Sequence, residues 1–183
     1  MLVPILMLRV EVYSHSRHRH LGEQIANLYH SAVTAIDDAR YSAAQRLAWS
    51  AAPRSGRYWQ LRLKRAQAWV MLKGSEQSPL CVGFVLLETT FRERGYIACL
   101  YVAPDSQRQG VASSLLEATK KWALTQGYHH LTTDASALSK PVFERAGFRL
   151  RHKSYQEKSG QMFGSYFMKL ILAPLVHERV KSS

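Results

Sequence analysis

The stretch GYIACLYVAPDSQRQGVASSLLEATKKWALTQG, residues 95–127, indicates how the whole chain folds. Residues 97–102 are apolar at every position, which predicts a central strand buried on both faces of a sheet. Pro104 and Asp105 end this strand, because proline donates no hydrogen bond and aspartate favours turns. From Val111 onward apolar residues recur at helical spacing, and Gly127 is a favourable left-handed cap for the helix end. The stretch therefore predicts a strand, a short loop and an amphipathic helix.

The loop between strand and helix, QRQGVA at residues 107–112, predicts an anion-binding site. A glycine loop at a helix N-terminus leaves the first backbone N–H groups unpaired, and the helix dipole favours a negative charge there. Gly110 and Ala112 keep bulky side chains away, and Arg108 adds a positive charge suited to phosphate oxygens. For a single glycine at this place, an ordinary strand-to-helix turn is the alternative interpretation.

Two motifs in this chain resemble motifs of the GNAT superfamily of bacterial, acetyl-CoA-dependent N-acetyltransferases, and they are separated as in that family. LYVAPDSQRQGVASSLL, residues 100–116, is similar to the acyl-CoA-binding motif of that family. LTTDASALSKPVFERAGF, residues 131–148, is similar to the family's next strand, helix and closing Gly-Phe pair. With the final strand ending in YFMKL, the resemblance spans about residues 80–172.

The resemblance implies an α/β (α+β) GNAT fold formed by residues 1–183 as a single domain. It implies a mixed sheet of about six to seven strands with a splayed parallel pair, flanked by about four helices. The pantetheine arm of acetyl-CoA would lie in the gap of that pair, and the pyrophosphate would rest on the amides of residues 109–113. Packing is the main alternative role for Tyr101. The cofactor-binding residues implied are Leu100, Tyr101, Val102, Gln107, Arg108, Gln109, Gly110, Val111, Ala112, Ser113, Ser136 and Phe143.

Composition excludes a disordered chain, because 46% of residues are hydrophobic and 21% are charged. Cys81 and Cys99 fall in expected strands without metal-ligand spacing, so we expect reduced core residues of a cytoplasmic protein. Residues 1–8 are apolar but too short to span a bilayer, and we assign them to the first strand. Residues 173–183 are expected to form a polar tail. The net charge of +12 permits nucleic acid, an anionic membrane surface or a phosphate-rich cofactor without choosing among them.

The N-terminal half predicts the wall that receives the acceptor substrate. We expect helices near residues 21–33, 42–49 and 58–67, and strands at 68–72 and 80–90. The run SHSRHRH, residues 14–20, lacks metal-ligand spacing and is expected to be a solvated loop, with no metal bound. By resemblance, the first two helices cover the acceptor side. Tyr29, Tyr41 and Trp49 are therefore candidate substrate-binding residues, with core packing as the alternative.

The implied reaction is attack of an amine on a thioester, which requires an amine that has lost its proton. By resemblance, Phe143 stands where many members of the family carry a tyrosine near the thioester sulfur, and Ala98 stands where close relatives often carry an acidic residue. Asp134, at the end of its strand, is our first candidate for the base, with a role as a turn cap as the alternative. Positioning of the amine without a single essential base is also open. The further candidates are Glu88, Tyr155 and Tyr166.

The sequence therefore predicts transfer of an acetyl group from acetyl-CoA to a primary amine, with a small-molecule acceptor preferred. Direct attack in a ternary complex is implied. Two alternatives stay open, namely a catalytically weak module that binds or senses acyl-CoA, and an acetyltransferase that acts on a protein amine. Nucleic-acid binding rests on charge alone, because no sequence motif of a nucleic-acid-binding fold is present. We expect a monomer or homodimer without a membrane span.

Overall fold

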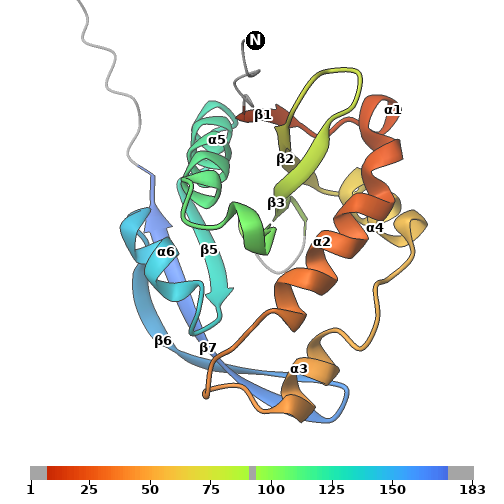
Figure 1. The fold of residues 1–183 in the computed structure, drawn as a ribbon. Coiled ribbons are helices and arrows are strands. Elements are labelled where there is room, and N and C mark those ends of the chain that lie inside the picture. The colour runs from red at the N-terminus through yellow and green to blue at the C-terminus, as the bar shows by residue number, and fades with distance from the viewer. Residues whose placement is uncertain (1–7, 91–93, 173–183) are drawn as a thin grey trace, which may run out of the picture.

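A computed structural model describes residues 8–90 and 94–172 and shows a mixed sheet with helices on both of its faces (Figure 1). Within these residues the sheet has seven strands in the order β1-β2-β3-β4-β5-β7-β6, of which β4 and β5 are parallel neighbours. The predicted fold class is thereby confirmed. The strands are β1 Leu8–Val12, β2 Gln67–Lys73, β3 Leu80–Glu88, β4 Tyr96–Val102, β5 His130–Ala135, β6 Arg149–Lys158 and β7 Gln161–Ile171.

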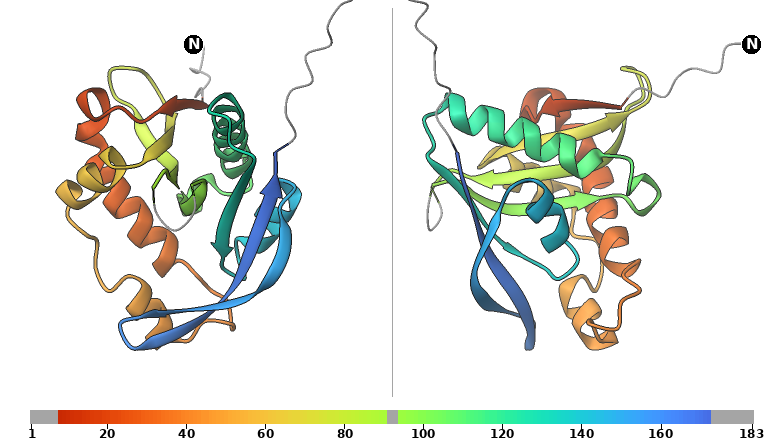
Figure 2. Two further views of the ribbon diagram at one scale, coloured as in Figure 1. Left: turned by 180° about the vertical axis from the view of Figure 1, so that it is seen from behind. Right: turned by 90° about the vertical axis from the view of Figure 1, so that its left-hand side faces the viewer.

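Helices cover the two faces of the sheet separately, and Figure 2 shows α5 on the side opposite α2. One core lies under α5 and includes Trp69, Leu115 and Phe148, whereas the other lies under α2 and α4 and includes Ile25 and Phe84. Burial on both faces explains the apolar run in β3 that ends at Leu87. β4 is apolar as well, but Ile97 is its one fully buried residue. The helices are α1 His15–His18, α2 Gly22–Thr34, α3 Ala43–Trp49, α4 Gly56–Lys64, α5 Val111–Thr125 and α6 Lys140–Arg145, with 3₁₀ turns η1 Arg19–Leu21 and η2 Pro104–Ser106.

The sheet opens between β4 and β5. Leu86 pairs with Cys99 and Leu87 pairs with Ile97, so Ala98 is left over as a bulge in β4. A bulge bends its strand and interrupts pairing. Correspondingly, β4 and β5 share a single ladder pair, Tyr96 with Thr132. The Thr133 hydroxyl donates to the Ile97 carbonyl over 3.0 Å, and beyond this point the two strands diverge.

The β6–β7 hairpin extends from the opened side of the sheet toward α3 (Figure 1). Its two-residue turn, Ser159 and Gly160, has positive φ at both positions, as hairpin turns of the I′ type require. Beside that turn, the Gln45 side chain of α3 donates to the Met162 carbonyl over 2.8 Å. The hairpin and α3 therefore form a continuous wall facing β4.

Two predictions about the N-terminal region had different outcomes. The predicted solvated loop at residues 14–20 is wrong, because this segment forms α1 and η1 and buries His18. His18 accepts from the Ser14 amide over 2.9 Å and lies 3.2 Å from a Glu11 carboxylate oxygen. This tertiary contact has no signature in the local pattern. The assignment of residues 1–8 to the first strand and of 173–183 to a tail concerns residues that, apart from Leu8 in β1, lie outside the described ranges.

Candidate active site

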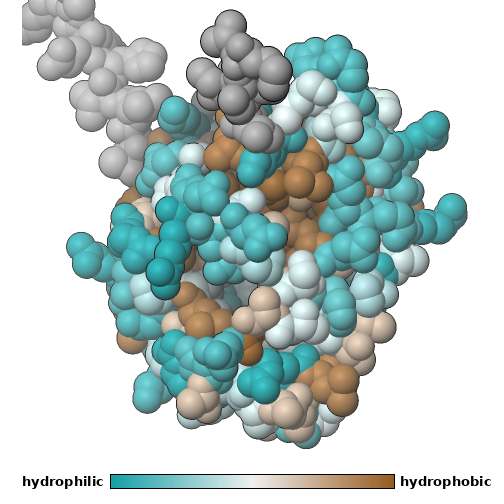
Figure 3. Space-filling view, in the orientation of Figure 1, coloured by the Kyte–Doolittle hydropathy of each residue, from teal (hydrophilic) through white to brown (hydrophobic). Residues whose placement is uncertain are grey.

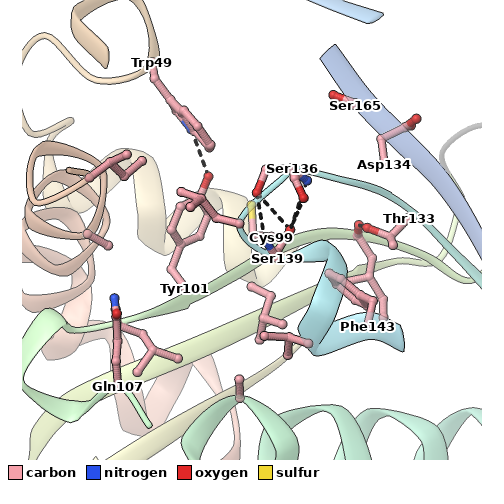
Figure 4. Close-up of a pocket in the computed structure, with 18 of the residues that line it drawn as sticks. Trp49, Cys99, Tyr101, Gln107, Thr133, Asp134, Ser136, Ser139, Phe143 and Ser165 are labelled. Atoms are coloured by element: carbon pink, nitrogen blue, oxygen red, sulfur yellow. Dashed lines mark hydrogen bonds between the residues drawn. The ribbon is translucent and has the colours of Figure 1, made fainter. Parts of the chain in front are cut away.

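A cavity of about 700 Å³ occupies the opening between β4 and β5. In the space-filling view the surface is hollowed near the middle of the face (Figure 3). The cavity runs from the loop before α5, past the ends of β4 and β5, to α3 and the tip of the β6–β7 hairpin. Figure 4 shows side chains from these separate elements pointing into the same space. The divergence of two parallel strands has thus produced a groove rather than a sealed core.

The α5 end of the cavity is built to receive an anion. Gly110 is the N-cap of α5, with φ +79°, and no side chain caps the helix there. The amides of Val111, Ala112 and Ser113 begin the helix and have no acceptor within it. A Cβ at Gly110 would meet no atom within 4 Å, so the space in front of these amides is open. Arg108 also has positive φ, at +61°, and lines the same space.

The predicted cofactor-binding residues gather along one side of the cavity, with one exception. The residues that line it are Leu100, Tyr101, Val102, Gln107, Arg108, Gly110, Val111, Ala112, Ser113, Ser136 and Phe143. The Gln109 side chain instead donates to the Asp105 carbonyl over 2.9 Å, and Gln109 does not line the cavity. On their other edge, Leu100 and Val102 pair with β3. One edge of β4 is thus paired and the other faces the cavity.

Ser136 and Ser139 shape the wall opposite β4. Their hydroxyl oxygens are 3.0 Å apart, and each hydroxyl accepts from the backbone amide of the other residue. This reciprocal pair fixes the entry into α6, from which Phe143 lines the cavity (Figure 4). Within residues 8–90 and 94–172, no group of three or more His, Cys, Asp or Glu residues is placed to hold a metal ion.

Asp134 lies on the cavity, unlike the other three catalytic candidates. Its carboxylate accepts hydrogen bonds from the Tyr96 hydroxyl at 3.0 Å and the Ser154 hydroxyl at 2.6 Å. The donors come from β4 and β6, so the carboxylate is held between the two halves of the sheet. Glu88 is buried against Arg62, away from the cavity. Tyr155 is 70% exposed on β6, and the Tyr166 ring lies under the Lys140 ammonium.

Aromatic side chains form the acceptor end of the cavity. Tyr41 and Trp49 line it as predicted, and the Trp49 indole N–H donates to the Tyr101 hydroxyl over 3.1 Å. Tyr29 does not reach the cavity. It packs between Trp59 and Tyr101, with ring centroids 5.1 and 4.6 Å away. Burial raises the pKa of Tyr29 to about 12, so its hydroxyl stays protonated.

Cys99 lines the cavity from β4, between the cofactor side and the acceptor end. Burial raises the pKa of its thiol to about 11, which keeps the sulfur protonated near neutral pH. Burial also raises the pKa of Tyr101 well above its ordinary value. The floor of the cavity is therefore polar but carries no charge from these two groups.

Sequence reasoning missed the contribution of the β6–β7 hairpin tip. Gln156, Lys158 and Phe163 all line the cavity. The Lys158 ammonium lies 5.2 Å from the Trp49 ring centroid and 5.9 Å from that of Phe163. Burial lowers the pKa of Lys158. The available signal was the Ser-Gly dipeptide, which predicts a tight hairpin turn but does not say what the tip contacts.

Comparisons with known proteins agree with this geometry. A family model for an acetyltransferase (GNAT) domain matches residues 51–170. The chain is 33% identical over 147 residues to the uncharacterized N-acetyltransferase YafP of Escherichia coli K12, covering 80% of this chain and 87% of YafP.

Solved structures show the same fold at lower identity. A GCN5-related N-acetyltransferase from Rhodopseudomonas palustris gives a TM-score of 0.72 at 23% identity, covering 94% of this chain and 99% of that one. YncA from Salmonella typhimurium, solved with its cofactor acetyl-CoA, gives 0.67 at 16% identity, covering 91% and 94%. At such identities the likeness is one of fold.

Proposed function

The chain belongs to the GNAT acetyltransferase family and is an acyltransferase, and on this premise we propose that it acetylates the primary amine of a small molecule. Acetyl-CoA would be the donor, and the amine would attack it directly in a ternary complex. The observation that carries the proposal is the groove between β4 and β5, which has an uncapped helix N-terminus at one end and an aromatic wall at the other.

The cofactor side of the groove matches the chemistry of an acyl-CoA. The open amides at the start of α5, the helix dipole and Arg108 together suit a diphosphate. At Leu100 and Val102 the edge of β4 that faces the cavity has no strand paired with it in the described residues, and it offers backbone groups along which an amide-containing arm can lie. Backbone N–H groups near the β4 bulge are suited to polarise the thioester carbonyl.

Asp134 is the group we propose to accept the proton from the incoming amine, directly or through water. A protonated amine has no lone pair, so attack requires this deprotonation. The Tyr96 and Ser154 hydroxyls fix the orientation of the carboxylate at the point where β4 and β5 diverge. Asp134 lines the same groove as the cofactor-side residues and the aromatic wall, so an amine bound in the groove could approach its carboxylate.

Gly110→Trp tests the cofactor site, and Gly127→Trp is the matched control. Both glycines have positive φ, at +79° and +71°, and at both an added Cβ meets nothing within 4 Å. They occupy opposite ends of α5, so both variants carry a similar backbone strain. We expect acetyl-CoA affinity, measured by calorimetry, to fall at least about 100-fold in Gly110→Trp, because the indole fills the anion's place. Equal affinity in the two variants would contradict the proposed site.

A binding or sensing module is the second candidate, and Phe143 favours it because phenylalanine cannot donate a proton to a departing thiolate. Thiol release from acetyl-CoA, measured against a panel of small amines and of peptides with free N-termini or lysines, separates these functions. Release with small amines supports the proposed enzyme, and release with peptides alone indicates a protein amine as acceptor. Tight acetyl-CoA binding without release for any amine would replace the enzyme with the module.

A further inference from the structure

We propose that the acceptor amine carries a carboxylate, which binds to Lys158 at the tip of the β6–β7 hairpin. This inference rests on the proposed function and specifies the class of its acceptor. It concerns the end of the cavity that lies farthest from the anion-binding start of α5. The residues involved are Lys158 and Gln156 of β6, together with the aromatic pair Trp49 and Phe163.

Lys158 is held in place rather than extended into solvent. It is the last residue of β6 and pairs with Gln161 across the tight Ser159-Gly160 turn. Its ammonium lies over the rings of Trp49 and Phe163, which contact each other edge to face with centroids 5.6 Å apart. The hydrogen bond from Gln45 to the Met162 carbonyl fixes the hairpin tip to α3. The position of the charge is therefore set by the fold.

The Lys158 ammonium has no carboxylate partner among residues 8–90 and 94–172. Its side chain is half-buried and lines the cavity. Removing a charge from water without pairing it is unfavourable, and contact with two rings offsets this partly. Burial lowers the pKa of Lys158, and the nearby Arg54 guanidinium lowers it further. An anion in the cavity would provide the partner that the protein does not supply.

A carboxylate fits this position better than a phosphate does. The anionic group would meet one ammonium and the Gln156 amide, which lies two residues earlier on the same face of β6. Phosphate sites commonly use planar Arg groups or several converging amides, and the cavity has such a set at its other end, at Arg108 and the start of α5. The two ends of the groove therefore have distinct preferences, and the end where Lys158 is the cation that lines the cavity suits a singly charged oxyanion.

Strand β6 fixes the distance between the proposed binding position of the acceptor's carboxylate and that of its amine. Ser154, Gln156 and Lys158 alternate along one face of β6, and Ser154 donates to Asp134, the proposed base. Ser154 and Lys158 are four positions apart along the strand, which gives a Cα separation of roughly 13 Å. Asp134 and Lys158 both line the cavity, so the span that a ligand must cover is shorter than this Cα separation. An acceptor whose amine and carboxylate are separated by several bonds fits this arrangement better than an α-amino acid.

The test compares paired acceptors that differ in one charge. Glycine, β-alanine, γ-aminobutyrate and ε-aminocaproate are each assayed against their own primary amide, with thiol release from acetyl-CoA as the readout. The native protein is expected to favour the acid of its best pair by about 10-fold to 100-fold in kcat/KM, the range expected for a hydrogen bond to a charged group. Lys158→Met should remove this preference. Lys153→Met, an exposed lysine on the same strand, should keep it.

The outcomes separate this inference from the function on which it rests. Acetylation of acids and amides at equal rates by the native protein would overturn the carboxylate assignment and leave the acetyltransferase intact. A preference for the acid that persists in Lys158→Met would also overturn it. Acetyl-CoA binding by Lys158→Met, measured in parallel, shows that this variant is folded. Acetyl-CoA binding with no transfer to any amine would overturn the proposed function and this inference together.

Discussion

At the scale of single residues, Asp134 shows which properties of a candidate catalytic residue can be inferred from the sequence and which require the structure. The sequence marks it as a carboxylate at the end of a strand, which is equally consistent with a turn cap. Hydrogen bonds from Tyr96 and Ser154 bind its two oxygens from strands distant in sequence. Those partners depend on the β6–β7 register, which no local pattern specifies. The position of Asp134 near the end of a strand was therefore predictable, but the hydrogen bonds that hold its side chain were not.

Asp134→Asn should lower kcat by about 10²-fold to 10⁴-fold if the carboxylate accepts the amine proton. Asparagine preserves size and keeps one acceptor oxygen, although its NH2 group can only donate to the second hydroxyl. Asp134 is not among the proposed cofactor-binding residues, so acetyl-CoA affinity should not change. The measurement is steady-state thiol release with the best acceptor, over a range of pH. Ser154→Ala is the comparison, because it removes one hydrogen bond to the Asp134 carboxylate but keeps the carboxylate itself. It should therefore lower kcat less than Asp134→Asn does. Unchanged kcat in Asp134→Asn would mean that positioning of the amine suffices.

Lys158→Met should stabilise the protein near neutral pH. Burial lowers the pKa of Lys158 in the folded state below its ordinary value of 10.5. Between the lowered pKa and 10.5 the unfolded chain binds more protons, so the contribution of this residue to stability rises with pH in that window. Below the window the folded protein bears the full desolvation cost. Urea unfolding at about pH 7 and about pH 10 should therefore show a gain for Lys158→Met that shrinks at the higher pH. A gain independent of pH would contradict this account.

Among the helices and strands, those specified by local sequence patterns were predicted, and those that depend on tertiary contacts were not. Apolar runs and helical spacing predicted β4 and α5, because β4 is apolar at every position and α5 buries one face along its length. The capping box of α3 was likewise readable, since Ser42 and Gln45 satisfy each other within one turn. The α1 segment was not predicted, because the burial of His18 depends on its contact with Glu11 in β1. Such a contact leaves no pattern within the segment itself. Elements were predictable where the information is local.

Ser42→Ala should weaken acceptor binding through α3. The Ser42 hydroxyl accepts from the Gln45 amide over 3.1 Å, and losing such a cap costs about 1 kcal/mol. Tyr41 lies just before this helix and Trp49 is its last residue, so we expect KM for the acceptor to rise more than KM for acetyl-CoA. Ser55→Ala is the matched control, because Ser55 caps α4 in the same way. The two variants should lose similar stability in urea unfolding. Equal acceptor KM values in both would contradict a role for α3 in the acceptor wall.

At the scale of the whole molecule, the resemblance predicted the mixed sheet with its divergent pair, and the structure confirms both. The prediction succeeded because one continuous stretch, residues 95–127, includes the central strand, the anion loop and the covering helix. The acceptor wall was predicted less completely, since it joins α3 to a hairpin more than 100 positions away in the chain. In the described ranges no helix has the length and apolar character needed to cross a membrane.

Acetyl-CoA should stabilise the whole molecule in a salt-dependent way. Ligand at 100 times Kd adds about 2.7 kcal/mol, which corresponds to a rise in Tm of roughly 5 to 10 °C for a chain of this size. The net charge of +12 attracts the polyanionic ligand, so the rise should diminish as ionic strength increases. Thermal unfolding at low and high salt measures both effects. Gly110→Trp should show no rise, and a full rise in that variant would place the ligand elsewhere.

The single ladder pair between β4 and β5 makes the junction between the two halves of the sheet easy to deform. Strands β1 to β4 and strands β5 to β7 are each well hydrogen-bonded internally, but near Tyr96 and Thr132 few backbone bonds hold the two sets together. A donor lying along the free edge of β4 would act as an additional strand that stiffens this junction. When coenzyme A leaves after transfer, this junction would become more flexible again. Amide exchange at the diverging ends of the two strands should accordingly be slowest when the groove is occupied.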